Sequence, residues 1–177
     1  MVALGFNSID RNVMKKVVVY SRGQVMDMSP SNKYCLISIW SKSPLNTRDY
    51  NDDDIDMDGW MDVIKMEFDD VTYQQPNMKF TLFDHVFASE LLDFIEKIDG
   101  EFTKIIVHCD AGISRSTAVA AFLRDAYDYN VYYKGHGHSD EFRNVLVYTG
   151  LRREWMRRNG TSYEETAPDV SSPYSRK

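Results

Sequence analysis

Short apolar segments alternate along the chain with longer stretches in which apolar residues recur at helical spacing. Four of the short segments are rich in β-branched, aromatic or other apolar residues and are predicted to be strands: residues 17–20, 34–40, 64–68 and 104–108. In the third of these, Ile64, Met66 and Phe68 alternate with Lys65 and Glu67, so one face of that strand is expected to be wetter than the other.

Helical periodicity predicts two helices around the last strand. The first carries an apolar stripe that ends before a stop signal at Gly100 and consists of Phe87, Leu91, Phe94, Ile95 and Ile98. The second, residues 116–128, follows the fourth strand directly and has a stripe formed by Val119, Phe122, Leu123 and Ala126.

A third helical region is expected to begin at an N-cap, Ser139, which is followed by two acidic residues that suit the helix dipole. Its apolar pattern continues through Leu151, and Gly150 is a candidate break that would divide it into two helices. Two consecutive arginines before Gly160 are typical of its C-terminal end.

Strands that alternate with helices indicate an α/β fold, with a central, mostly parallel sheet of four or five strands flanked by helices. The chain has 177 residues, which fits one compact domain. We place this domain at residues 1–160. Residues 161–177 are poor in aliphatic side chains and contain Ser, Pro and Glu, so a mobile C-terminal tail is predicted there.

Composition narrows the classes of partner. The net charge of −6 argues against non-specific binding to nucleic acid. The longest apolar runs fall far short of the roughly 20 residues that span a bilayer, so no membrane association is expected. The first ten residues lack the basic flank and apolar stretch of a secretory signal. No signal peptide is therefore predicted, and the expected location is cytoplasmic. Two cysteines, Cys35 and Cys109, suggest a reactive thiol rather than a disulfide framework.

The segment V-H-C-D-A-G-I-S-R-S, residues 107–116, lies where the fourth strand hands over to a helix. Unpaired backbone N–H groups at a helix N-terminus, together with the helix dipole, form an anion site. We therefore call residues 108–115 the anion loop. Cys109 at its start is expected to ionise readily to the nucleophilic thiolate. Arg115 can fold back and grip two oxygens of an anion with its planar fork, and Gly112 permits the turn that directs the amides inward.

The order of Cys, five residues and Arg, with His before and Ser after, resembles the protein tyrosine and dual-specificity phosphatase superfamily. The string H-C-D-A-G-I-S-R-S-T-A, with L-I-S-I and F-D-D upstream, is most similar to small bacterial and phage tyrosine-phosphatase-like proteins, over roughly residues 17–129. The resemblance implies a dual-specificity-phosphatase-like fold and a hydrolase that needs no metal or other cofactor.

The same resemblance assigns roles to the residues of the anion loop. Cys109 would form a phosphocysteine that water then hydrolyses, while Arg115 stabilises the phosphoryl group in the transition state. Ser116 would hydrogen-bond the leaving sulfur, and His108 would fix the geometry of the loop. The phosphate would be bound by the residues from Cys109 to the helix, namely Asp110, Ala111, Gly112, Ile113, Ser114 and Arg115.

Expulsion of the leaving group needs a proton, which the family takes from an aspartate on an upstream loop. Asp69 and Asp70 end the third predicted strand, at the edge where ligands gather in open α/β sheets. The likeness to an F-x-D pattern favours Asp70, with Asp69 as the alternative. Asp84 precedes a helical stripe and is interpreted as an N-cap, and His85 as a residue of the helix start.

The expected substrate is a phosphorylated protein or peptide. Phosphotyrosine is favoured over phosphoserine and phosphothreonine because a phenoxide leaves more readily than an alkoxide. Phosphoinositide phosphatases of the superfamily carry lysines in the loop, where this chain has Asp110 and Ile113. RNA 5′-phosphatases carry a basic approach surface, which the net charge argues against. An arsenate reductase with a similar thiolate loop, or a non-catalytic phosphoprotein-binding module, would also fit the motif.

Three other features are assigned no function. The acidic stretch of residues 49–62 follows calcium-loop spacing from Asp54 to Asp62, but Lys65 occupies the place of the closing bidentate Glu, so a solvated loop is favoured. His136 and His138 lack an acidic or thiol partner nearby and are interpreted as part of a polar loop. Cys35 lies within a predicted strand and is interpreted as a buried, inert thiol, with a disulfide to Cys109 as the alternative.

Overall fold

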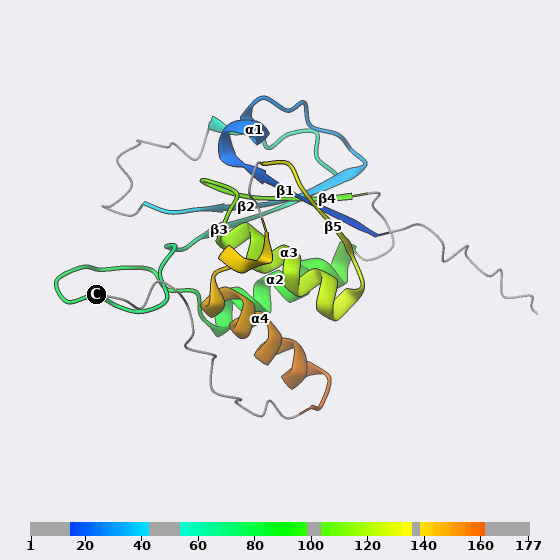
Figure 1. Cartoon of the computed structure of the whole chain (residues 1–177). Helices are drawn as coiled ribbons and strands as arrows, with labels where there is room; N and C mark the ends of the chain where they lie inside the picture. Colours follow the sequence, from blue (N-terminus) through cyan, green and yellow to red (C-terminus); the bar gives the residue numbers. More distant parts are fainter. Residues whose placement is uncertain (1–14, 43–53, 99–103, 136–138, 162–177) are drawn as a thin grey trace, which may run out of the picture.

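A five-stranded sheet organises the computed structural model, which describes residues 15–42, 54–98, 104–135 and 139–161. The strands are β1 (Lys16–Ser21), β2 (Tyr34–Trp40), β3 (Asp62–Glu67), β4 (Lys104–Cys109) and β5 (Asn130–Tyr133). They lie in the order β3-β2-β4-β1-β5, and each neighbouring pair is parallel. The fold is therefore a single α/β domain, as predicted, and β4, which leads into the anion loop, lies at the centre of the sheet (Figure 1).

The four predicted strands are confirmed to within two residues, but two elements were not predicted. Strand β5 is short, lies at the sheet edge and alternates between exposed and partly buried residues, so it lacks an apolar run. Asp128 ends the preceding helix in the left-handed conformation, with φ of 60°, and turns the chain toward this edge. The short helix α1 (Arg22–Met26) begins directly after β1 with a capping box formed by Ser21 and Gln24.

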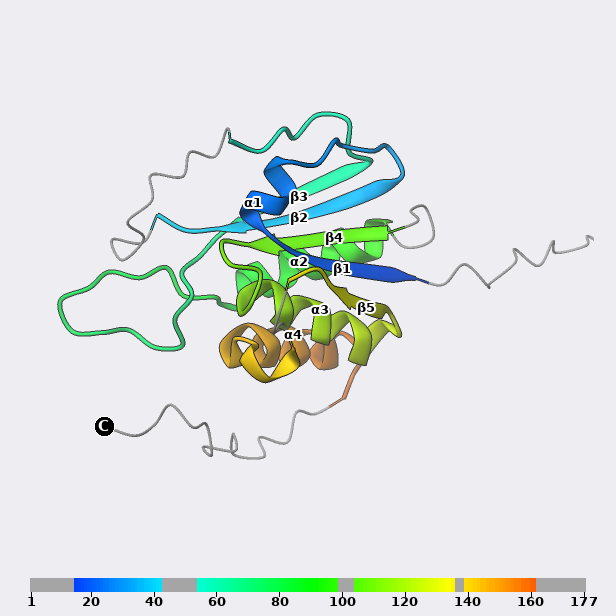
Figure 2. The ribbon, with the colours of Figure 1, turned by 45° about the horizontal axis from the view of Figure 1, so that its top comes forward.

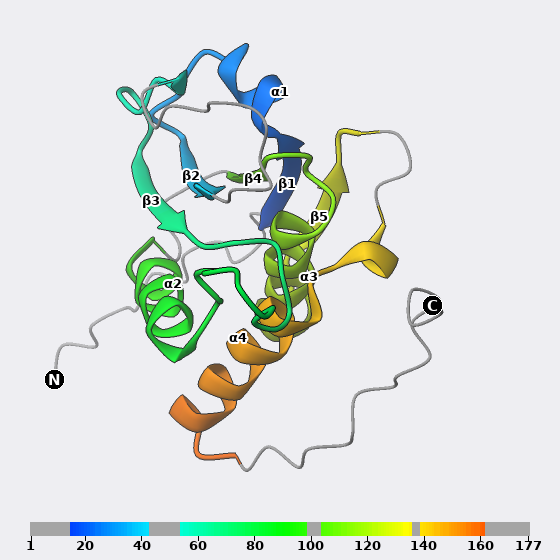
Figure 3. The same ribbon diagram turned by 90° about the vertical axis from the view of Figure 1, so that its left-hand side faces the viewer.

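Alternation along the strands sends side chains to two unequal faces. Ile105, Val107 and Cys109 of β4 belong to the main core, which the three longer helices cover. Ile106 belongs to a smaller apolar cluster on the opposite face, with Val25 of α1 among its members. Figure 1 shows α1 on one side of the sheet and the three longer helices on the other, and Figure 3 shows the same division from the side.

Helices α2 (His85–Ile98) and α3 (Arg115–Tyr127) match the first two predicted helices. The predicted stop signal at Gly100 lies outside the described residues. Every residue of α3 from Arg115 to Leu123 is buried, so this helix occupies the middle of the helical layer. Among the described residues, no helix combines the length and apolar character that crossing a bilayer requires.

The third helical region differs from its prediction in where it breaks. Ser139 does accept a hydrogen bond from the N–H of Glu141, as an N-cap would, but it caps only a 3-10 turn, η2 (Asp140–Phe142). Helix α4 (Val145–Arg158) then starts at a second cap, Asn144, whose side chain accepts from the N–H of Val147. The chain thus breaks at residues 143–144, and the prediction of a break at Gly150 is wrong.

Gly150 lies inside α4 because the helix packs closely against Phe83 there. A Cβ built on Gly150 would lie 2.9 Å from Cε1 of Phe83, closer than a normal contact. Phe83 itself packs on Phe68 and Phe87, with ring centroids 5.0 and 6.0 Å apart. The glycine is therefore needed for the approach of two elements and not for a helix end.

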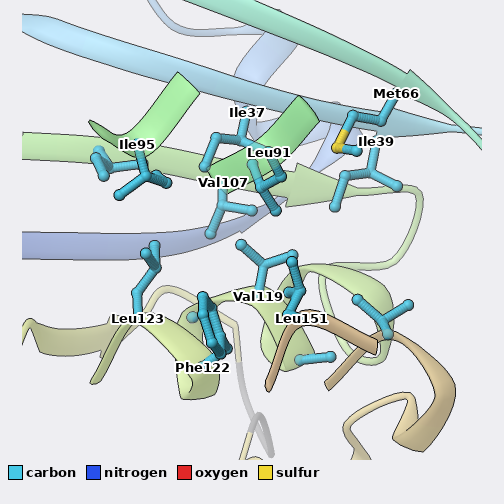
Figure 4. Packing of buried hydrophobic residues seen from close by; sticks show 14 of the residues in the cluster. Ile37, Ile39, Met66, Leu91, Ile95, Val107, Val119, Phe122, Leu123 and Leu151 are labelled. Atoms are coloured by element: carbon cyan, nitrogen blue, oxygen red, sulfur yellow. The ribbon is translucent and has the colours of Figure 1, made fainter. Parts of the chain in front are cut away.

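The main core lies between the sheet and these helices. Figure 4 shows Ile37, Ile39 and Val107 of the sheet facing Val119, Phe122 and Leu123 of α3, with Leu151 of α4 beside them. At its far end α4 is tied to α2, because Arg158 donates to the hydroxyl of Ser89 at 2.8 Å and lies 2.8 Å from Asp93. This packing fixes the first turn of α3, which carries part of the anion loop.

Candidate active site

The thiol of Cys109 lies at the carboxyl end of β4, next to Ser21 at the end of β1. The residue is 2% exposed. Its Sγ atom lies 3.1 Å from the hydroxyl oxygen of Ser116 in the first turn of α3. A hydroxyl at this distance can donate a hydrogen bond to a thiolate, so Cys109 and Ser116 are brought together as the sequence predicted.

The backbone of the anion loop is seated on the junction of β1 and α1. Gly112 has φ of +71°, and a Cβ there would lie 2.6 Å from the carbonyl oxygen of Tyr20. The N–H of Arg22 donates to the carbonyl of Asp110 at 3.2 Å. Only glycine satisfies both the backbone conformation and the close approach at position 112. On either side of it, Ala111 and Ile113 are exposed at the outer surface of the loop.

Arg115 is the first residue of α3, and its side chain is 3% exposed. Nη1 donates to the carbonyl of Phe68 at 2.7 Å, and Nη2 donates to Oδ2 of Asp110 at 2.6 Å. Nε is buried and has no hydrogen-bond partner. Oδ2 of Asp70 lies 3.9 Å from this Nε. The guanidinium is thus held beside the loop with its Nε free of hydrogen bonds, as an arginine that receives an anion requires.

His108 faces the opposite side of the sheet from Cys109. Its cross-strand neighbour in the register is Ser38, and Nε2 lies 2.8 Å from the Ser38 hydroxyl. Burial, reinforced by the nearby charge of Arg22, lowers the pKa of His108 to about 3. The imidazole is therefore neutral at physiological pH and ties β4 to β2 directly before the thiol, which suits a role in loop geometry and not in proton transfer.

Asp70 follows β3 and approaches the anion loop from the side. Its Oδ1 accepts hydrogen bonds from the hydroxyl of Ser114 at 2.8 Å and from the side-chain amide of Asn144 at 2.9 Å. The Asp70 side chain is 40% exposed, and its Oδ2 faces Nε of Arg115. Oδ1 therefore fixes the orientation of the carboxyl group, while Oδ2 is the oxygen that can carry a proton toward a ligand of the loop.

Asp69 points elsewhere and closes a loop. Its N–H donates to the carbonyl of Thr81 at 2.7 Å, and its Oδ2 accepts from the N–H of the same residue at 2.7 Å. This reciprocal pair joins the two ends of the segment between β3 and α2, which extends beyond the sheet in Figure 2. The carboxylate of Asp69 is engaged in that structure, whereas Asp70 faces the anion loop.

The other two candidates upstream are parts of a helix start. Oδ1 of Asp84 accepts from the N–H groups of Val86 and Phe87 at 2.9 and 3.2 Å, which confirms Asp84 as the cap of α2. His85 is exposed at the first position of that helix, also as predicted.

Two further groups of the site were not predicted. Asn144 is 5% exposed; besides its bond to Asp70, its own N–H donates to the carbonyl of Ser114 at 3.1 Å. It thereby joins α4, the anion loop and the loop of Asp70. Asp110 is predicted as a residue of the phosphate-binding loop, but the ion pair of its carboxylate with Arg115, at 2.6 Å, is not predicted. An acid five residues before Arg115 in so tight a loop was the signal that could have revealed the ion pair.

Three aspartates of the acidic stretch have partners in the part that is described, residues 54–62. Asp54 lies 3.6 Å from the buried guanidinium of Arg22, Asp56 accepts from the N–H of Asp58, and Asp62 pairs with Lys97 at 2.7 Å. Within the described ranges, no group of three or more His, Cys, Asp or Glu side chains could hold a metal ion. Residues 49–53, His136 and His138 lie outside those ranges.

Cys35 is fully buried in β2, and burial, reinforced by Asp62, raises the pKa of its thiol to about 11. Its register partner on β4 is Ile105, four residues before Cys109. At about 3.3 Å per residue this offset is roughly 13 Å, well beyond the Cα separation of up to about 7 Å that a disulfide spans. A disulfide between the two cysteines is therefore excluded in this fold.

Comparison with known proteins finds no matching family model, no matching curated protein and no matching solved structure. What the site can do therefore follows from its own geometry and from the motif.

Proposed function

We propose that this chain is a cysteine-dependent phosphatase that hydrolyses phosphate monoesters, phosphotyrosine in proteins above all. The observation that carries the proposal is the grouping at the start of α3: a thiol 3.1 Å from the Ser116 hydroxyl and a buried guanidinium whose Nε makes no hydrogen bond among the described residues. A nucleophile, a leaving-sulfur donor and an anion ligand thus meet at one helix N-terminus.

In the first step, the Cys109 thiolate attacks phosphorus, a sulfur–phosphorus bond forms and the bond to the ester oxygen breaks. The departing oxygen takes a proton from Oδ2 of Asp70, whose orientation is held by Ser114 and Asn144. Arg115 and the loop amides bind the equatorial oxygens as charge builds on them.

In the second step, water attacks the phosphocysteine and gives up a proton to the Asp70 carboxylate, and the sulfur leaves as a thiolate. Ser116 is placed to donate a hydrogen bond to that sulfur and so ease its departure. Free phosphate is the product, and the thiolate and the protonated Asp70 are restored for the next turnover. No external reductant is consumed.

An aromatic substrate is supported by the rim of the site. Ile113 is 37% exposed beside Ser114, and Val145 is 49% exposed beside Asn144, so two exposed apolar side chains flank residues that contact Asp70. Such side chains gain by covering the ring of a phosphotyrosine, whereas phosphoserine presents little apolar surface to them. The phenoxide is also the better leaving group.

The geometry of the two cysteines weakens the arsenate reductase alternative. Such an enzyme passes oxidation from its first thiol to a second thiol, and Cys35 cannot reach Cys109 within this fold. The 177-residue sequence contains two cysteines, so each turnover would need a thiol from outside these residues. Hydrolysis requires water alone.

The proposal is tested by incubating a panel of phosphotyrosine and phosphoserine peptides with the wild-type chain and with Cys109→Ser, without added thiol. We expect phosphate release by the wild type, fastest from phosphotyrosine, and loss of turnover in Cys109→Ser with phosphopeptide binding retained, because the amides and Arg115 remain. Activity of Cys109→Ser above a few per cent of the wild type would reject Cys109 as nucleophile. Phosphopeptide binding without turnover by the wild type would identify a binding module instead.

A further inference from the structure

We propose that Asp110 is the internal counter-ion of Arg115 and sets how tightly the anion loop holds phosphate. The inference rests on the proposed function and goes beyond it, because it assigns a specificity role to a side chain of the loop that takes no part in the bond-forming steps. Its consequence is fast release of the phosphate product.

The ion pair is built into the loop. Oδ2 of Asp110 accepts from Nη2 of Arg115 at 2.6 Å, while the second oxygen, Oδ1, is buried without a hydrogen-bond partner. The Asp110 side chain is 22% exposed and the Arg115 side chain 3%, so water screens the pair only in part. Asp110 therefore places a full negative charge directly against the cation that an anion in the loop must share.

The arrangement leaves the guanidinium half occupied. Nη1 donates to the carbonyl of Phe68 and Nη2 to Asp110, whereas the buried Nε makes no hydrogen bond among the described residues and lies 3.9 Å from Oδ2 of Asp70. Since Nε and Nη2 form one edge of the guanidinium, Asp110 engages one donor of the edge that grips an anion side-on. The aspartate thus orients this edge and at the same time offsets part of its charge.

The charge balance predicts the effect on ligands. A phosphate dianion in the loop meets Arg115 and the helix dipole as attractions, and the Cys109 thiolate and Asp110 as repulsions. Removal of the Asp110 charge takes away one close repulsion. Affinity for free phosphate should then rise, whereas the catalytic rate depends on whether the orienting hydrogen bond to Nη2 survives.

Two substitutions separate charge from position. Asp110→Asn retains an oxygen that can accept from Nη2 but removes the charge, and Asp110→Ala removes both. The matched control is Asp93→Asn, which makes the same change in net charge on α2, where the side chain is 68% exposed. Inorganic phosphate is titrated into each protein by calorimetry at pH 7, and kcat and KM are measured with a phosphotyrosine peptide.

Asp110→Asn should bind inorganic phosphate about tenfold more tightly than the wild type, with kcat within about threefold. Asp110→Ala should lose kcat about tenfold or more, because the guanidinium is no longer oriented. Asp93→Asn should match the wild type in both measurements. Unchanged or weaker phosphate binding by Asp110→Asn, or the same gain in Asp93→Asn, overturns the inference. A wild-type chain that neither binds nor releases phosphate overturns the proposed function itself.

Discussion

At the scale of single residues, neighbours in sequence divide between two environments. His108 and Cys109 are consecutive, yet the strand pleat sends the thiol to the helical face and the imidazole to the face of α1. There the histidine is buried completely, beside the Ser38 hydroxyl and near the charge of Arg22. The resemblance predicts a histidine that fixes the loop, and the surroundings of His108 keep its imidazole in the neutral form.

The neutral state of His108 predicts a loss of stability in mild acid. Because burial depresses the folded-state pKa to about 3, protonation favours the unfolded chain, where a histidine titrates near pH 6.5. The contribution of neutral His108 to the free energy of unfolding is complete above pH 6.5 and falls steadily as the pH drops toward 3. Between pH 7 and pH 5 the loss should be about 2 kcal/mol.

Urea unfolding at pH 7 and pH 5 measures this loss. In His108→Gln the side chain at position 108 does not titrate in this range. The free energy of unfolding of this variant should therefore fall by about 2 kcal/mol less than that of the wild type over the same interval. His85→Gln, which replaces an exposed histidine by the same residue, controls for the substitution itself. Equal pH dependence of wild type and His108→Gln would show that His108 does not titrate as its burial implies.

At the scale of elements, close packing determines where the helices run. Apolar periodicity located α2 and α3 because their stripes repeat over three or four turns. It misplaced the break before α4 because a glycine can either end a helix or allow another element to pack closely against it. Which of these roles applies depends on the neighbouring element, and the helix's own sequence does not show that element. Here the ring of Phe83 lies opposite Gly150.

Gly150→Ala is therefore expected to destabilise the protein, against the usual trend. In an exposed helix interior, alanine is favoured over glycine by about 1 kcal/mol. At position 150 the added methyl would lie 2.9 Å from Cε1 of Phe83, and overpacking of this kind costs roughly 1–3 kcal/mol.

The control is Gly23→Ala in α1, where an added Cβ meets no atom within 4 Å. Thermal unfolding should show a lower melting temperature for Gly150→Ala than for the wild type, and an unchanged or higher melting temperature for Gly23→Ala. A Gly150→Ala protein as stable as Gly23→Ala would show that the Phe83 ring can move aside without loss of stability.

At the scale of the whole molecule, parallel topology brings the ends of β1, β3 and β4 to one edge of the sheet, and the site forms there. The sequence predicts this edge, the thiol and the arginine, because each follows directly from a strand and a motif, and the resemblance favours Asp70 over Asp69. It does not predict what depends on register and packing. Asn144 caps α4, and its contact with Asp70, 74 residues away, arises only when α4 packs on α2 and α3.

This long-range contact gives a prediction about catalysis. If Asn144 acts by holding Asp70, its removal should slow the step in which the leaving group is protonated. Asn144→Ser suits the test because serine still caps α4, while its shorter side chain ends one bond before the amide nitrogen that donates to Oδ1 of Asp70. Positioned acids contribute roughly a hundredfold to ten-thousandfold, so Asp70→Asn should lose at least about a hundredfold with phenyl phosphate and Asn144→Ser a part of that.

The decisive measurements are leaving-group dependence and non-additivity. Both variants should lose less rate with nitrophenyl phosphate than with phenyl phosphate, because a good leaving group needs less help from an acid. The double variant should be no slower than Asp70→Asn alone, since Asn144 would act only through the missing carboxyl group.

Two further variants serve as controls. Thr149→Ala in α4 controls for general disturbance of the helix. Asp69→Asn should weaken the loop that closes on Thr81 without this leaving-group dependence. An Asn144→Ser protein that slows both substrates equally, or whose effect adds in full to that of Asp70→Asn, would show that Asn144 supports the fold and not the acid.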